Sequence, residues 1–139
     1  EGATDRASFK NFSFNFDSAA GIIYTVDVTK PKGEKVTITS MADGTPFSLD
    51  KMYKVALNSY RGNGGGELLT KGSGISQDEL KDRILYSTDK DLRYYLMQYI
   101  EKKGVIEPHA LGLWKFIPEE WVEPAAKRDY EYLFGKVEK

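Results

Sequence analysis

An apolar segment runs directly into a glycine-rich loop at residues 53–74, which read YKVALNSYRGNGGGELLTKGSG. Over residues 53–58, large apolar side chains alternate with polar or small ones. This period of two predicts a strand with one buried face. Tyr60 would continue the second face and stand at the strand's end, beside the loop. The chain is therefore expected to be organised around this strand, the loop and a short helical segment that follows.

The loop at residues 62–66, called here the glycine loop, has the sequence GNGGG. Glycine costs roughly 0.5–1 kcal/mol in an ordered element and is favoured where φ is positive or another group approaches the backbone closely. Two interpretations stay open, a tight turn packed under a helix and a ligand site. Neither GxGxxG nor GxxxxGK[ST] fits, because Glu67 stands where a third glycine is needed and Lys71 follows Thr70.

The composition predicts one ordinary globular domain. The chain has 139 residues, no cysteine, a formal net charge of −1, 40% hydrophobic and 13% aromatic residues. That is enough to build a core of its own. The balanced charge argues against a nucleic-acid polymer as partner, which normally meets a basic face. No run approaches the ~18 apolar residues of a membrane span.

The first part of the chain carries strand patterns. Three phenylalanines alternate with polar residues over 12–16, which predicts a half-buried strand. Residues 22–28 and 36–38 are expected to pair as an antiparallel hairpin, because turn residues at 30–33 separate them. Another turn is expected at 43–46.

Helical signals follow the glycine loop. Residues 76–79 have the pattern of a capping box, with Leu80 and Ile84 as the apolar stripe of a short helix. A second start at 88–91 predicts a helix of roughly 14 residues that ends at Gly104.

Prolines punctuate the last part of the chain. Glu119 and Glu120 are interpreted as a solvated helix start, and a last helix is expected from about Ala125 to Phe134. Four apolar side chains are interpreted as packing residues: Leu113, Trp114, Phe116 and Trp121. No domain boundary is expected.

Two motifs resemble a known family. The run Y-x-V-A-x-N-x-Y-R-x-N-G-G-G at residues 53–66 resembles Y-x-V-x-x-x-N-F-x-x-x-G-G-D-G in the C-terminal, substrate-binding domain of the 5′-nucleotidases. That family includes UDP-sugar hydrolases and 2′,3′-cyclic-nucleotide phosphodiesterases. Upstream, FDSAAGIIYTVDVTKPKGEKV at residues 16–36 resembles the family's strand pair G-x-x-Y-x-x-D-x-x-x-x-x-G-x-R-V. Together the motifs cover approximately residues 12–70.

The resemblance and the local patterns together lead us to expect an α+β domain, a small mixed or antiparallel sheet covered by helices. Residues 1–139 would form a single domain of the 5′-nucleotidase C-terminal type, either whole or as its later part. In the family this domain holds the nucleoside, with the base stacked between two aromatic rings. A non-catalytic interaction or structural domain that kept the fold and lost the pocket is the alternative.

The resemblance implies a set of candidate substrate-binding residues. Tyr60 falls on the second stacking ring, whereas the first ring belongs to a segment that precedes Phe14 and is expected to be missing here. The family's aspartate, which accepts bonds from the ribose hydroxyls, falls on Gly66, so that either Glu67 replaces it or the ribose is held differently. The full candidate set is Asn58, Tyr60, Arg61, Asn63, Gly64, Gly65, Gly66 and Glu67.

Two members of this set fit the family pattern less directly. Asn58 lies one position before the family's asparagine when the loop is aligned without gaps. Arg61 has no counterpart in the motif. Its guanidinium group could stack on or bond the base or the phosphate, and a surface salt bridge is the other interpretation.

No catalytic or metal-ligating residue is expected in this chain. The family's hydrolytic centre is a pair of divalent metals held by several side chains of a separate N-terminal domain, and two-metal chemistry needs such convergent ligands. This chain has one histidine, His109, interpreted as a surface or packing residue. The expected partners are a nucleoside or nucleotide and the metallophosphatase domain, in the same polypeptide or a partner chain. A periplasmic or extracellular location, in the cell envelope, follows from the resemblance alone.

We therefore expect the isolated chain to have no phosphatase activity with any divalent metal, because it lacks the ligands of a dimetal centre. A rigorously purified sample can be assayed with nucleoside monophosphates and with Mg²⁺, Mn²⁺, Co²⁺ or Zn²⁺. Turnover at rates typical of enzymes would contradict this expectation.

Overall fold

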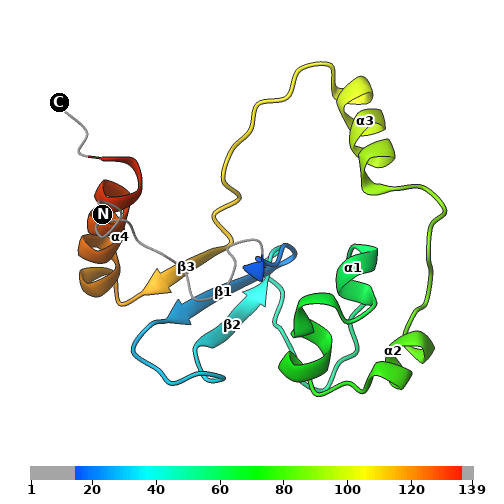
Figure 1. Cartoon of the computed structure of the whole chain (residues 1–139), viewed down its shortest axis with the longest axis horizontal. Helices are drawn as coiled ribbons and strands as arrows, with labels where there is room; N and C mark the ends of the chain where they lie inside the picture. The colour runs from blue at the N-terminus through cyan, green and yellow to red at the C-terminus, as the bar shows by residue number, and fades with distance from the viewer. Residues whose placement is uncertain (1–14, 136–139) are drawn as a thin grey trace, which may run out of the picture. The chain divides into compact units, whose positions relative to one another are not determined.

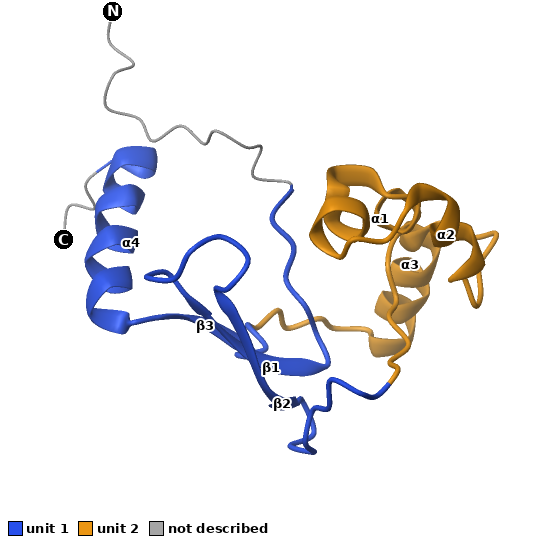
Figure 2. Cartoon of the chain, turned by 90° about the horizontal axis from the view of Figure 1, so that it is seen from below, with its two compact units in different colours: residues 1–51, 110–139 blue, residues 52–109 orange. Residues whose placement is uncertain are grey.

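The computed structural model describes residues 15–135 and divides the chain into two compact units (Figure 2). Unit 1 contains residues 1–51 and 110–139, and unit 2 contains residues 52–109. Along the chain (Figure 1) the elements are β1 (Ile22–Asp27), β2 (Val36–Met41), α1 (Ser59–Gly62), the 3-10 turn η2 (Gly65–Glu67), the π-helical turn η3 (Leu68–Gly72), α2 (Gln77–Asp82), α3 (Leu92–Lys103), β3 (Trp114–Ile117) and α4 (Glu119–Phe134).

Unit 1 is built on a small mixed sheet. β1 lies in the middle, antiparallel to β2 and parallel to β3. Tyr24 of β1 is opposite Ile38 on one side and opposite Trp114 on the other. The expected hairpin is confirmed, and Gly33 supplies the positive φ of its turn, +95°. Sheet and helices together confirm the α+β fold.

Aromatic rings form the core of unit 1. Tyr24 is 7% exposed and stacks on Trp114, with 5.9 Å between ring centroids and an interplanar angle of 10°. The Trp114 ring also meets the edge of Phe116 at 5.1 Å and lies 5.8 Å from Phe16. The Tyr24 hydroxyl accepts a hydrogen bond from the backbone N–H of Ala19. Trp114 is therefore the centre of this cluster, which agrees with its interpretation as a packing residue.

Two strand predictions are not matched. Residues 52–58 form no strand, and Val55, expected to be buried, is 73% exposed. Alternation alone does not make a strand, because a strand also needs a hydrogen-bonded neighbour, and the described sheet contains only β1, β2 and β3. Phe12 and Phe14 lie outside the described residues, whereas Phe16 lies in no strand and is 62% exposed.

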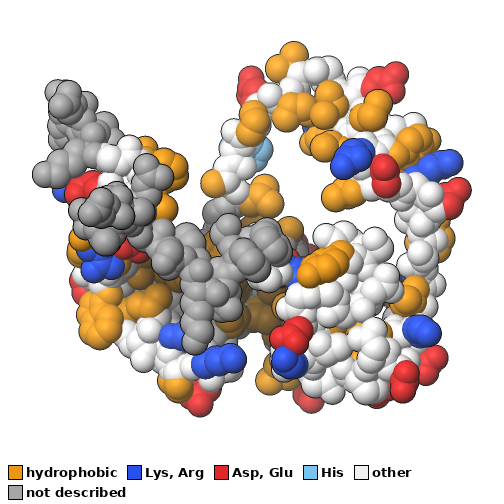
Figure 3. All heavy atoms as spheres, viewed as in Figure 1, with side chains coloured by type: hydrophobic (Ala, Val, Ile, Leu, Met, Phe, Trp, Pro, Cys, Tyr) orange, Lys and Arg blue, Asp and Glu red, His pale blue; other side chains and the backbone are white. Residues whose placement is uncertain are grey.

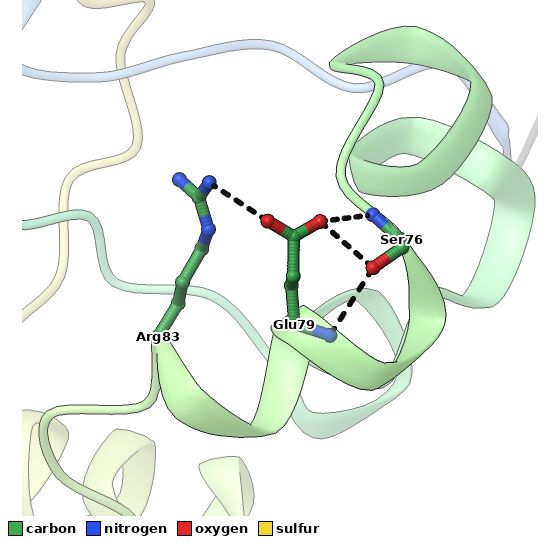
Figure 4. Close-up of polar contacts among 3 residues, drawn as sticks. All are labelled: Ser76, Glu79 and Arg83. Carbon is green, nitrogen blue, oxygen red and sulfur yellow. Dashed lines mark hydrogen bonds and ion pairs between the residues drawn. The ribbon is translucent and has the colours of Figure 1, made fainter.

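The capped helices are confirmed. In α2 the Ser76 hydroxyl accepts from the backbone N–H of Glu79, while the Glu79 carboxylate accepts from Ser76 in return (Figure 4). Leu80 is buried at 4% exposure, but Ile84 lies beyond the helix and is 48% exposed. In α3 the Asp91 carboxylate caps the first turn.

The C-terminal helix differs from its expected bounds. α4 begins at Glu119, before the predicted start at Ala125, and includes Pro124. Carboxylates in the first turn favour this earlier start, so the interpretation of Glu119 and Glu120 as a helix start is confirmed. Pro124 lies within α4 although it has no backbone N–H to donate to the helix.

Many apolar side chains lie at the surface (Figure 3). Four apolar side chains that can share one face of α3 are all exposed by more than a third: Leu92, Leu96, Tyr99 and Ile100. Among residues 15–135, no helix combines the length and apolar character needed to cross a membrane.

The capping box should make α2 sensitive to pH. Hydrogen bonds from Ser76 lower the pKa of Glu79 from its ordinary value of 4.5, and Arg83 lowers it further. A carboxyl group whose pKa is lowered by folding stabilises the fold above the unfolded pKa, and this stabilisation is lost as pH falls through the folded pKa.

We expect Glu79→Gln in the full-length protein to reduce amide protection in α2 at pH 7 and to have little effect at a pH below the folded pKa of Glu79. Hydrogen-exchange protection factors at the two pH values measure this. Glu107→Gln, at an exposed loop position, is the control and should change neither value. An equal loss of protection at both pH values would rule out the contribution of the Glu79 charge.

Candidate functional site

The residues expected to bind substrate all lie in unit 2, from Asn58 to Glu67. Asn58 has extended backbone angles, and its side-chain oxygen accepts a 2.8 Å hydrogen bond from the backbone N–H of Arg61. This bond caps α1, because it satisfies one of the free N–H groups of the helix start. Tyr60 therefore stands on a single helical turn and not at the end of a strand. The amide nitrogen of Asn58 is the part of that side chain that could donate to a ligand.

The glycine loop is explained largely by contacts within the protein. Gly64 and Gly66 have φ values of +88° and +70°, which side chains rarely adopt. A Cβ atom at Gly64 would lie 2.7 Å from Oε1 of Gln77, and one at Gly65 would lie 2.6 Å from the ring of Tyr60. The interpretation of a turn packed under a helix is therefore correct for Gly64. Glycine content alone does not indicate a ligand here.

Two side chains of helix α2 contact the glycine loop. The side-chain amide of Gln77 donates a 3.0 Å hydrogen bond to the carbonyl oxygen of Asn63. Leu80 is buried, and its Cδ1 atom would lie 3.2 Å from a Cβ atom at Gly64. Sequence reasoning did not assign Gln77 and Leu80 to the site. The available signal was the capping box, which places a helix start directly after the loop.

Tyr60, Arg61 and Gly65 lie together. The Tyr60 side chain is 55% exposed, whereas Arg61 is buried at 5% exposure. The guanidinium carbon of Arg61 lies 5.3 Å from the centroid of the Tyr60 ring, and Nη1 donates a 3.1 Å hydrogen bond to the carbonyl oxygen of Gly65. The prediction that Tyr60 borders the glycine loop is confirmed. Of the two interpretations of Arg61, the surface position is not what the structure has, because the side chain is buried and turns inward to the loop.

Glu67 has an unusual backbone conformation. Its φ of +61° makes it the non-glycine residue with positive φ in the described chain, and it joins η2 to η3. Such a conformation costs about 1–3 kcal/mol and π-helical turns are rare, and both features occur often at functional sites. The Glu67 carboxylate is exposed and forms an ion pair with Lys71. This is the side chain that could take the place of the family's ribose-binding aspartate.

Within residues 15–135, no group of three or more histidine, aspartate or glutamate side chains is placed to hold a metal ion. The Nδ1 atom of His109 lies 3.1 Å from the carbonyl oxygen of Glu107, and the side chain is at an exposed position.

The glycine positions differ in whether they can accept a side chain. Gly65 does not have a positive φ, but glycine is still required there, because a Cβ atom would collide with the Tyr60 ring and carbonyl group. We expect Gly65→Ala to destabilise unit 2 by about 1–3 kcal/mol, as overpacking does, and Gly65→Val to cost more.

Gly62 offers a matched control, because a Cβ atom there would meet no atom within 4 Å and its φ is not positive. Gly62→Ala should be neutral or slightly stabilising, since alanine is favoured over glycine in a helix. Urea unfolding of the full-length protein measures both. Equal stability of the Gly65→Ala and Gly62→Ala variants would contradict the described packing.

Comparison with known proteins agrees with the motifs. The chain is 31% identical over 121 residues to the trifunctional nucleotide phosphoesterase protein YfkN of Bacillus subtilis, an alignment that covers 78% of this chain and 8% of that protein. It is 29% identical over 121 residues to a 2′,3′-cyclic-nucleotide 2′-phosphodiesterase/3′-nucleotidase of Haemophilus influenzae, which covers 76% of this chain and 17% of that protein. The chain thus spans less than a fifth of either relative.

No solved structure matches the chain significantly. Residues 3–71 match the family model described as 5′-nucleotidase, C-terminal domain. The match includes β1, β2, α1 and the complete glycine loop. Through these residues, the chain belongs to the 5′-nucleotidase C-terminal domain family.

Proposed function

We propose that the chain is part of the substrate-binding domain of a 5′-nucleotidase-like phosphoesterase and that it binds the nucleoside part of the substrate. The base would lie against the ring of Tyr60, beside the glycine loop. The names of both relatives describe enzymes that act on nucleotides or cyclic nucleotides, which supports this class of ligand. The catalytic step belongs to another part of the full-length protein.

The half-exposed ring of Tyr60 carries the proposal. The Tyr60 side chain keeps 55% of its surface exposed, as several other aromatic side chains of the chain do, so part of its ring is open to a ligand. The ring is nevertheless held in place, because Gly65 packs against it and Arg61 lies over it. A fixed, accessible aromatic ring is what base stacking requires.

Polar groups of the candidate residues would suit the rest of a nucleoside. Gly65 lies against the Tyr60 ring, and the glycines of the loop carry no side chains that would obstruct a ligand. The amide nitrogen of Asn58 and the carboxylate of Glu67 would supply a donor and an acceptor. Glu67 already has a cationic neighbour in Lys71, so a ribose would need to share or displace that ion pair.

Hydrolysis would require the N-terminal metallophosphatase domain, where we expect two divalent metals to be bound. The metals would supply Lewis-acid activation of the phosphate there. The role left for this chain is to bind and orient the nucleoside. By the same family resemblance, we propose a periplasmic or extracellular location.

A different function has one observation in its favour. Gly66 stands where the family has its ribose-binding aspartate, and the nearest carboxylate, that of Glu67, is paired with Lys71. An interaction or structural domain that kept the fold and lost the pocket would have these features. Titration of the full-length protein with adenosine and other nucleosides separates the two functions.

Substitution of Tyr60 tests the proposal directly. Base–aromatic stacking contributes roughly 1–3 kcal/mol, so Tyr60→Ala in the full-length protein should lower kcat/KM for a nucleotide by about 5- to 150-fold. Tyr60→Phe should cost little, because the ring face makes the contact. Hydrolysis of a phosphate ester without a base should be nearly unaffected.

Tyr86→Ala is the matched control, since Tyr86 lies in the same unit and is 82% exposed. This variant should leave kcat/KM unchanged for both substrates. Melting curves of all variants show whether the fold is intact. A loss of equal size on both substrates, together with a lowered melting temperature in Tyr60→Ala, would mean that Tyr60 is only a packing residue.

A further inference from the structure

Arg61 is a charged residue that the fold keeps away from water. Its side chain is 5% exposed, whereas the neighbouring Tyr60 is 55% exposed. Burial of a charge costs free energy unless the charged group finds hydrogen-bond partners inside the protein. The N–H donors of Arg61 are therefore used within the protein. Two of its contacts there indicate its role.

One partner is the backbone of the glycine loop. Nη1 of Arg61 donates to the carbonyl oxygen of Gly65, at 3.1 Å. Gly65 lies between Gly64 and Gly66, which both have positive φ and whose backbones have wide conformational freedom. A hydrogen bond from a charged donor is stronger than one between neutral groups. This bond therefore fixes a carbonyl group in the most adaptable part of the loop.

The second partner is the Tyr60 ring. The guanidinium carbon lies 5.3 Å from the ring centroid, within the range of a cation–π contact. Gly65 closes the triangle, because a Cβ atom there would lie 2.6 Å from Cδ2 and Cε2 of the same ring. Arg61, Gly65 and Tyr60, called here the loop triangle, thus hold one another. Arg61 occupies one side of the ring, and the exposed remainder is available to a base.

We propose that Arg61 is a positioning residue: it sets the Tyr60 ring and the Gly65 carbonyl in the arrangement that receives the base, and it contacts neither base nor phosphate. This inference rests on the proposed function and specifies how its pocket is held. The N-cap of Asn58 on the backbone N–H of Arg61 supports the same role, since it fixes the turn from which the guanidinium reaches the loop.

A double-mutant cycle in the full-length protein tests the proposal. The variants are Tyr60→Ala, Arg61→Ala and the two combined, assayed with a nucleotide and with a phosphate ester that has no base. We expect Arg61→Ala to lower kcat/KM for the nucleotide on the order of tenfold, mainly through KM, and to leave the base-free ester unchanged. Because Arg61 acts through Tyr60, the double variant should lose no more than Tyr60→Ala alone.

Arg61→Lys and Arg93→Ala complete the set. The lysine variant keeps the charge and a single donor nitrogen and should show a smaller nucleotide-specific loss, even where Arg61→Ala folds poorly. Arg93 is an exposed arginine of α3, so its replacement removes a charge from unit 2 without touching the loop triangle. Hydrogen exchange of residues 64–67 should become faster in Arg61→Ala and stay unchanged in Arg93→Ala.

The outcomes are distinct. Additive losses in the double variant would show that Arg61 contacts the substrate itself and would overturn this inference while the proposed function stands. Equal losses on both substrates, or unchanged exchange of residues 64–67 in Arg61→Ala, would overturn it as well. An unaltered nucleotide activity in Tyr60→Ala would refute the proposed function, and the inference with it.

Discussion

The stacking of Tyr24 on Trp114 holds together two parts of the chain that are far apart in sequence. It accompanies the parallel pairing of β1 with β3, and parallel strands always need a long crossover connection. In this chain the connection contains β2 and the whole of unit 2. Unit 2 is thus an insertion between two strands of one sheet, and both of its ends are tethered as long as that pairing persists.

Local signals in the sequence predicted the locally determined elements. The hairpin, the capping box at Ser76 and the N-cap at Asp91 each depend on residues close together in the chain, and all three are confirmed. β3 was missed because it has only four residues and its partner is distant in sequence. The strand predicted within residues 52–58 is absent, although its sequence alternates. The described sheet contains no strand that pairs with this segment.

The sequence predicted which residues form the candidate site better than it predicted how those residues contact one another. Motif resemblance selected Tyr60 and the glycine loop, and the structure brings them into contact. Sequence could not show that Arg61 turns inward, because an arginine beside a glycine-rich loop is equally compatible with solvent. It also could not separate the two demands on glycine: Gly64 and Gly66 need positive φ, whereas Gly65 needs the absence of a side chain.

The attachment of α2 to the glycine loop affects where this chain can be divided. The match to the family model ends at residue 71, but Gln77 and Leu80, which cover the loop, come later. A fragment cut at the end of this match would contain Tyr60 and every glycine of the glycine loop, and it would leave the Asn63 carbonyl without the Gln77 donor and Gly64 uncovered. Fragments made for crystallisation or ligand screening should therefore extend past Arg83, beyond the end of the helix that completes the loop.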